Sequence, residues 1–202
     1  MPLPPEPWVY ADQLIRAMAV AAQIHAAQVR KDTTIPYLSH LLGACSIAME
    51  YGATEDEAIA ALLHDAIEDG EPVEAARATV RSVGPDVGRI VEGCTDSDTH
   101  QKPPWRPRKV AYLARLASED RSVLLVSASD KPHNARSIVR DLRDVGAAVW
   151  DRFSLPKEDS LMSYRTLVAT YQKSPNRNPA LIDELDRTVT EMEALARSVV
   201  KR

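Results

Sequence analysis

The sequence predicts an all-α, single-domain protein, and three observations support this prediction. Apolar residues recur at intervals of three and four over most of the chain, which is typical of amphipathic helices. No segment alternates apolar and polar residues as a half-buried strand would. The core must consist mainly of Ala, Leu, Val and Ile, because the 202 residues include three Trp and one Phe. A chain of this length can bury its own hydrophobic core as one domain.

The overall charge and the cysteines narrow the classes of partner and compartment. A net charge of −4 gives no general attraction to nucleic acid or to an anionic membrane, so we expect neither as a partner. Cys45 and Cys94 match no zinc or redox spacing, which is typical of free thiols in a reducing compartment. The N-terminal segment MPLPPEPWVY lacks the features of a signal peptide, and no apolar run reaches the ~20 residues of a membrane span. We therefore expect a cytoplasmic protein.

The first three helices are expected before residue 70. Helical spacing predicts one helix over 11–30 and a second over 37–51, with the polar break KDTTIP between them. Thr54 and Glu57 form a capping-box pattern just before the apolar run AIAALL. This pattern starts a third helix, which we expect to continue to about Glu68.

The rest of the chain predicts more helices and one long loop. Periodicity, prolines and glycines place them at about 72–84, 86–94, 108–117, 161–171 and 178–200. The polar, proline-interrupted segment 95–107 is expected to be a loop, and loops of this length are commonly functional. The run VLLVSAS (123–129) has strand propensity, but the helical spacing around it favours a buried helix. We expect residues 1–202 to form a single domain, with a core over about 10–172 and a C-terminal helix that packs on this core or on a partner.

The segment ALLHDAIEDG concentrates the chemistry of the chain. On a continuous helix, His64 and Asp65 share one face with Glu68 and Asp69, because side chains three or four positions apart are neighbours. Three carboxylates beside an apolar run repel one another and are costly to bury. A bound cation would remove this conflict. The alternative is a solvated acidic helix end that follows a core histidine.

Two further residues can complete a metal site. His40 follows PYLS at the start of the second helix, and Asp130 follows VLLVSAS. Together with His64 and Asp65 they offer two imidazoles and two carboxylates, a set that suits manganese, iron or zinc better than calcium or magnesium alone. Four protein ligands leave open positions for water and phosphate oxygens, as a catalytic site needs.

These residues resemble those of a known family. His40, the pair His64-Asp65 and Asp130 match the H…HD…D signature of the HD phosphohydrolase superfamily. More narrowly, RKDTTIPYLSH, ALLHDAIED, IVEGCTD and SDKPHN resemble the hydrolase half of RelA/SpoT proteins, over roughly residues 10–172. No synthetase or regulatory domain is expected in this chain, so it resembles the small alarmone hydrolases, which are single HD-domain helical bundles.

The resemblance implies a role for each candidate residue. It implies one Mn²⁺ per chain with four protein ligands: His40, His64, Asp65 and Asp130. It implies that Glu68 and Asp69 act in catalysis, that Arg30 and Lys31 lie against the nucleotide, and that Asn134 lies near the ribose and phosphate.

Two features of the sequence bear on substrate binding. The family usually has Leu in place of Pro132, and a proline at this point can kink the helix and displace Asn134. The segment KPPWRPRK can be a solvated loop. An acidic protein that holds a multiply phosphorylated nucleotide needs local cations, however, and Lys102, Arg106 and Lys109 are then candidate phosphate contacts.

The activity implied by the resemblance is removal of the 3′-pyrophosphate from (p)ppGpp or (p)ppApp, the alarmones of the stringent response. Guanine and adenine both stay open, as do a monomer and a homodimer. A first alternative is an HD-type phosphatase that acts on another nucleotide, such as NADPH or a deoxynucleotide. A second is a non-catalytic nucleotide sensor, against which the intact pair Glu68 and Asp69 argues.

Overall fold

The computed structural model describes residues 12–97 and 104–198, and this part of the chain is helical and contains no strand. Its helices are α1 (Asp12–Ile24), α2 (Leu38–Glu50), α3 (Glu55–Leu62), α4 (Ala66–Asp69), α5 (Val73–Val83), α6 (Pro85–Cys94), α7 (Trp105–Leu116), α8 (Arg121–Val145), the 3₁₀ helix η1 (Ala147–Arg152), α9 (Lys157–Lys173) and α10 (Pro179–Ser198). The prediction of an all-α bundle is therefore confirmed.

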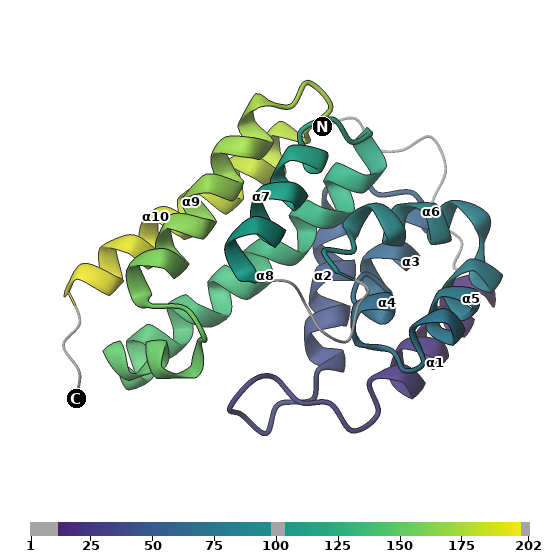
Figure 1. The fold of residues 1–202 in the computed structure, drawn as a ribbon, viewed down its shortest axis with the longest axis horizontal. Helices are drawn as coiled ribbons and strands as arrows, with labels where there is room; N and C mark the ends of the chain where they lie inside the picture. The colour runs from purple at the N-terminus through teal and green to yellow at the C-terminus, as the bar shows by residue number, and fades with distance from the viewer. Residues whose placement is uncertain (1–11, 98–103, 199–202) are drawn as a thin grey trace.

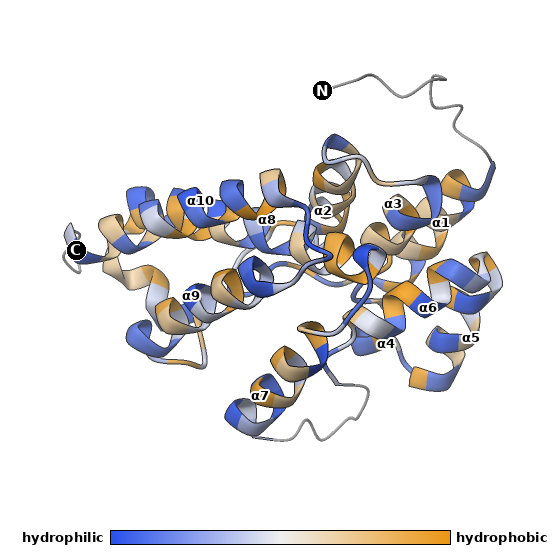
Figure 2. Ribbon diagram, turned by 90° about the horizontal axis from the view of Figure 1, so that it is seen from above, coloured by the Kyte–Doolittle hydropathy of each residue, from blue (hydrophilic) through white to orange (hydrophobic). Residues whose placement is uncertain are grey.

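The long helix α8 runs through the middle of the bundle (Figure 1). It contacts α2, α3 and α6 on one side and α10 on the other, so the C-terminal helix packs on its own core. Helices α1, α5 and α6 form the opposite end of the molecule from α9 and α10 (Figure 1). Helix α7 lies at the edge of the bundle against α9 (Figure 2).

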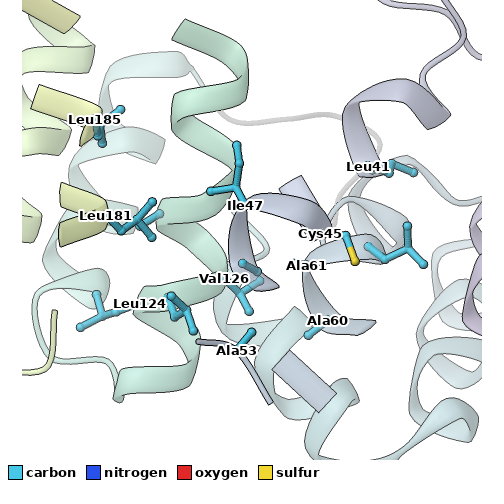
Figure 3. Packing of buried hydrophobic residues seen from close by; sticks show 14 of the residues in the cluster. Leu41, Cys45, Ile47, Ala53, Ala60, Ala61, Leu124, Val126, Leu181 and Leu185 are labelled. Atoms are coloured by element: carbon cyan, nitrogen blue, oxygen red, sulfur yellow. The ribbon is translucent and has the colours of Figure 1, made fainter. Parts of the chain in front are cut away.

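The buried hydrophobic residues form one contiguous cluster in which small side chains let the helices approach closely. Ala60 and Ala61 of α3 lie beside Cys45 of α2 (Figure 3), and all three are buried. On the other side of the cluster, Leu124 of α8 lies near Leu181 of α10 (Figure 3). Each fully buried leucine contributes about 1.5–3 kcal/mol to folding by removal from water. This core fixes α2, α3 and α8, the helices that carry the candidate ligands.

The first and third predicted helices end earlier than expected. Helix α1 ends at Ile24 and not near residue 30, because the following segment folds back as a turn in which Arg30 N–H donates to the carbonyl of Ile35 over 2.8 Å. The third helix begins at the predicted capping box but ends at Leu62. Residues 63–65 form a tight turn, and the one-turn helix α4 follows. The pair His64-Asp65 therefore lies at a helix junction and not on a continuous helix.

Two other predictions for the second half differ in outcome. The predicted loop over 95–107 is too long, because α7 already begins at Trp105. Pro107 is tolerated in its first turn, where backbone N–H groups have no partner within the helix. The run VLLVSAS is helical, as predicted, and α8 continues past Pro132 to Val145. Among the described residues, no helix is long and apolar enough to cross a membrane.

Candidate metal and phosphate site

The structure brings the four predicted ligands together from three places in the fold. His40 lies in α2, His64 and Asp65 at the α3–α4 junction, and Asp130 in α8. The Nε2 atom of His40 lies 3.2 Å from Asp130 Oδ1 and 3.8 Å from Asp65 Oδ2. The Nε2 atom of His64 lies 3.0 Å from Asp65 Oδ2 and 3.9 Å from Asp130 Oδ1. Ligand atoms of His40, His64 and Asp65 all lie within 4.8 Å of one another, which is close enough to share one ion.

The hydrogen bonding of the two His64 ring nitrogens shows that the cluster of four candidate ligands fits a divalent metal. Its Nδ1 atom lies 2.9 Å from the carbonyl oxygen of Ala61 and must carry a proton to donate to it. Its Nε2 atom is buried, and although Asp65 Oδ2 lies 3.0 Å away, the two atoms are not aligned for a hydrogen bond, which is costly for a polar atom. A metal on Nε2 would satisfy it, and would be flanked by the carboxylates of Asp65 and Asp130.

Without a metal, a proton is the alternative occupant of that nitrogen. Burial lowers the pKa of His64, but the carboxylates of Asp65 and Asp130 outweigh burial and raise it to about 9. Burial also opposes ionisation of Asp65, but the imidazole of His64 holds its pKa below the ordinary value. The cluster therefore attracts positive charge strongly, and proton and metal compete for one atom.

Hydrogen bonds outside the ligand set fix the orientation of the ligands. The Tyr37 hydroxyl donates to Asp65 Oδ2 over 2.6 Å. Lys131 Nζ donates to Asp130 Oδ2, and Asn134 Nδ2 donates to Asp130 Oδ1. Such partners orient metal ligands and raise their affinity. The contact of Asn134 with Asp130 also shows that Pro132 does not displace Asn134 from the site.

His40, the second histidine among the candidate ligands, has another histidine as its partner. The Nδ1 atoms of His40 and His133 lie 3.0 Å apart, and burial together with nearby His40 lowers the pKa of His133 to about 4. His133 is therefore neutral near pH 7 and can accept a proton from His40 Nδ1, which leaves His40 Nε2 free for a metal. Gly43 makes room for this ring: a Cβ at this position would lie 2.5 Å from His133 Nε2 and closer still to Cδ2.

The two residues of the predicted acidic pair, Glu68 and Asp69, lie in different places: Glu68 in the cleft and Asp69 on the surface. Glu68 lines the cleft together with the four ligands. Asp69 is exposed, and its Oδ2 atom accepts a hydrogen bond from Gln28 over 2.9 Å. The prediction of one shared helix face was wrong in its geometry, because the helix is interrupted before Asp65. The short helix α4 nevertheless delivers Glu68 to the ligands.

The predicted nucleotide contacts lie around an adjoining cavity of about 610 Å³. Arg30, Asn134 and Tyr37 line both this cavity and the metal cleft, whereas Lys31 lines the cavity alone. The Arg30 guanidinium donates to Asn134 Oδ1 over 2.6 Å. It lies 5.8 Å from the centre of the Tyr37 ring. Cavities of about 300–1,000 Å³ are typical of small-molecule sites, and a nucleotide fits this range.

The three basic residues of KPPWRPRK have different positions. Lys109 lines the metal cleft, and its Nζ donates to Asp96 Oδ2 over 2.6 Å. Arg106 is one turn earlier on α7, is exposed, and lies 3.3 Å from Asp159. It lines a groove between α7 and α9, which shares Lys109 and Lys131 with the metal cleft, and its phosphate contact stays a prediction. Lys102 lies outside the described residues.

Sequence reasoning missed Tyr37 and Lys131, which support the candidate ligands. They stand inside the segments PYLSH and SDKPHN, but only as neighbours of candidate ligands. Lys131 lines the cleft as a third cation beside Arg30 and Lys109. Its place directly after Asp130 was the available signal, because a buried carboxylate needs a partner.

The described helical bundle gathers two histidines and two aspartates in one buried cleft, a donor set that can hold a divalent metal ion. The chain belongs to the HD-domain family, whose model, described as "HD domain", matches residues 17–154.

Relatives in sequence and structure agree with this assignment. The chain is 33% identical over 125 residues to a probable GTP pyrophosphokinase of Mycobacterium leprae, and covers 15% of that protein with 61% of its own length. It is 35% identical over 129 residues to the GTP pyrophosphokinase rsh of Brucella ovis, and covers 17% of it with 62% of its own length. It thus spans less than a fifth of these two relatives.

A third relative is closer in length. The chain is 34% identical over 134 residues to guanosine-3′,5′-bis(diphosphate) 3′-pyrophosphohydrolase MESH1 of Xenopus tropicalis. The alignment covers 63% of this chain and 70% of that protein. Among solved structures, a metazoan orthologue of SpoT superposes with a TM-score of 0.72 at 23% identity, over 92% of this chain and 98% of that one. This likeness establishes the shared fold.

Proposed function

We propose that this protein is a Mn²⁺-dependent pyrophosphohydrolase that removes the 3′-pyrophosphate from (p)ppGpp or (p)ppApp. The observation that carries the proposal is the continuity of the metal cleft with the 610 Å³ cavity through Arg30, Tyr37 and Asn134. A nucleoside in the cavity would present its 3′ substituent to the ligands. The name of the Xenopus tropicalis relative, guanosine-3′,5′-bis(diphosphate) 3′-pyrophosphohydrolase, supports the choice of substrate.

The cavity offers separate surfaces for the base and for the 5′-phosphates. Phe153 and Tyr164 line the cavity with two aromatic rings against which a purine can pack. Arg30 and Lys31 bring positive charge to the same cavity and can pair with phosphate oxygens. The base and the 5′-phosphates would thereby hold the nucleotide in one orientation relative to the cleft.

In the cleft, His40, His64, Asp65 and Asp130 would hold the metal. A divalent ion there would neutralise the attacked phosphate and lower the pKa of water. Arg30, Lys109 and Lys131 line the same cleft and can stabilise charge on the leaving pyrophosphate.

Glu68 is the carboxylate placed to manage the proton of the attacking water. It lines the cleft beside the ligands, so it can orient a water molecule there and accept a proton from it. Water attacks the 3′-linked phosphorus, the bond from that phosphorus to the ribose oxygen breaks, and the ribose oxygen takes up a proton. The products are a nucleoside 5′-di- or triphosphate and pyrophosphate.

Compartment and assembly are the remaining parts of the proposal. Both Cys45 and Cys94 are free, which fits a reducing cytoplasm. The substrate is a small nucleotide that one chain can hold in its own cavity, so a monomer would suffice for turnover.

A turnover panel tests the proposal. Purified protein is incubated with ppGpp, ppApp or NADPH, each with Mn²⁺ and with chelator, and the phosphorus products are separated. We expect pyrophosphate from one or both alarmones, only with Mn²⁺. Orthophosphate from NADPH without pyrophosphate from either alarmone would favour the alternative phosphatase, and binding without any product would favour a sensor.

A further inference from the structure

The side chain of Gln28 bridges two residues on different parts of the fold. It follows α1, in the segment that leads to α2. Its Nε2 atom lies 2.9 Å from Oδ2 of Asp69, at the end of α4, and its Oε1 atom lies 2.5 Å from Nδ1 of His25. A single amide therefore connects a buried histidine to one member of the acidic pair.

Chemistry fixes the direction of both hydrogen bonds. An ionised carboxylate only accepts, so the Gln28 amide nitrogen must face Asp69 and donate to it. The amide oxygen then faces His25, whose Nδ1 must carry a proton to donate to that oxygen. The reverse orientation of the amide would place two acceptors against each other at Asp69. His25 is 3% exposed, so its ring provides a fixed anchor for the amide.

The Gln28 amide gives the Asp69 side chain a donor at an exposed position. Asp69 is the last residue of the one-turn helix α4, and its backbone N–H donates to the carbonyl of Asp65 over 2.9 Å. Glu68, the preceding residue, lines the cleft, so the position of α4 matters to both members of the acidic pair.

The same histidine is connected to a candidate metal ligand by a second route. The ring of His25 stacks on Tyr37 with centroids 5.3 Å apart and an interplanar angle of 27°. The Tyr37 hydroxyl in turn donates to Asp65 Oδ2 over 2.6 Å. The buried ring of His25 is thus connected to Asp65 through Tyr37 and to Asp69 through Gln28.

We propose that Gln28 is a positioning residue that sets the orientation of Asp69 through its side-chain amide, and that His25 anchors this amide while its ring also packs behind Tyr37. The inference rests on the proposed function for its kinetic consequences. Its geometric basis, the contact of the Gln28 amide with Asp69, is independent of the substrate.

The kinetic test replaces Gln28 by Met, which keeps the length of the side chain and removes both hydrogen bonds. Loss of a hydrogen bond to a charged group predicts a kcat about tenfold lower. The KM and the Mn²⁺ affinity should stay within about twofold, because the nucleotide cavity and the four ligands are untouched. The matched control is Gln13→Met on α1, whose Nε2 donates to the carbonyl of Val83 over 3.0 Å, away from the site. This control should keep the wild-type kcat.

A double substitution separates positioning from a general loss of structure. In an Asp69→Ala background, Gln28→Met should cause no further fall in kcat, because its effect passes through Asp69. Equal effects in both backgrounds, or a kcat for Gln28→Met equal to that of the Gln13→Met control, would overturn the inference.

An NMR measurement of the glutamine side chains tests the contact between Gln28 and Asp69 without any enzymatic turnover, so its result does not depend on the proposed function. The side-chain amide protons of Gln28 should shift in the NMR spectrum of Asp69→Ala, whereas those of Gln13 should not. Unchanged Gln28 signals would overturn the inference whatever the activity. If the Gln28 signals shift but the wild-type protein releases no pyrophosphate, the proposed function fails while the bridge between His25 and Asp69 stands.

Discussion

Gly43→Ala is expected to weaken metal binding although Gly43 touches no metal ligand. A Cβ at this position would occupy the space of the His133 imidazole, with 2.5 Å to its Nε2 atom. The ring must then move away from α2. Its Nδ1 atom, now 3.0 Å from Nδ1 of His40, would no longer accept the proton of that ligand.

The size of the effect follows from the burial of His40, which is 1% exposed. A buried donor left without its partner costs about 1–3 kcal/mol. Loss of the partner of a metal-ligating histidine typically lowers metal affinity 10–100-fold, or by about 1.4–2.7 kcal/mol. Alanine within a helix adds about 1 kcal/mol of helix propensity, which offsets part of the overpacking. Metal affinity should therefore fall about 10–100-fold, and the metal-free protein should also lose stability.

Calorimetric titration with Mn²⁺ and urea unfolding of the metal-free protein measure the two quantities. His133→Ala removes the ring without overpacking and should give a similar loss of Mn²⁺ affinity. In that background Gly43→Ala has space for its methyl group and should add nothing. Wild-type Mn²⁺ affinity in Gly43→Ala, or an equal further loss in the His133→Ala background, would refute the reasoning.

Two further predictions concern pH and the cations. The pKa of His64 is raised to about 9, so below this pH a metal must displace a proton from Nε2. The Mn²⁺ affinity should therefore rise about tenfold per pH unit below pH 9 and level off above it. A flat titration between pH 6 and 9 would contradict this competition. Lys109→Ala should lower kcat/KM for the alarmone at least about tenfold, because Lys109 lines the cleft, whereas Arg106→Ala should leave it within about twofold. Equal losses in steady-state kinetics would show that the α7–α9 groove takes part in binding.

Local patterns predicted those elements that depend on local contacts. The capping box of Thr54 and Glu57 forms as the sequence indicates, with both reciprocal hydrogen bonds. The buried run VLLVSAS is helical because its apolar residues continue the periodicity of a long amphipathic helix. The four candidate ligands come together in the structure for a related reason, since each stands next to an apolar segment that fixes its position.

The break at residues 63–65 was not readable, because the segment ALLHDAIED contains neither glycine nor proline. The turn is supported by contacts from elsewhere, such as the hydrogen bond of Tyr37 to Asp65 across 28 positions. The Gln28–Asp69 contact spans 41 positions and the His40–His133 contact spans 93. Such pairs depend on the tertiary arrangement and leave no periodic signal in the sequence.

The most direct test of the central claim compares wild-type protein with His64→Ala for both Mn²⁺ binding and release of pyrophosphate from ppGpp and ppApp. The account predicts that the wild-type protein binds one Mn²⁺ per chain and releases pyrophosphate only in its presence. His64→Ala should retain its helical circular dichroism but lose both binding and turnover, because it removes the buried nitrogen that faces the carboxylates of Asp65 and Asp130. Pyrophosphate release by His64→Ala in the presence of chelator, at the wild-type rate, would contradict the account.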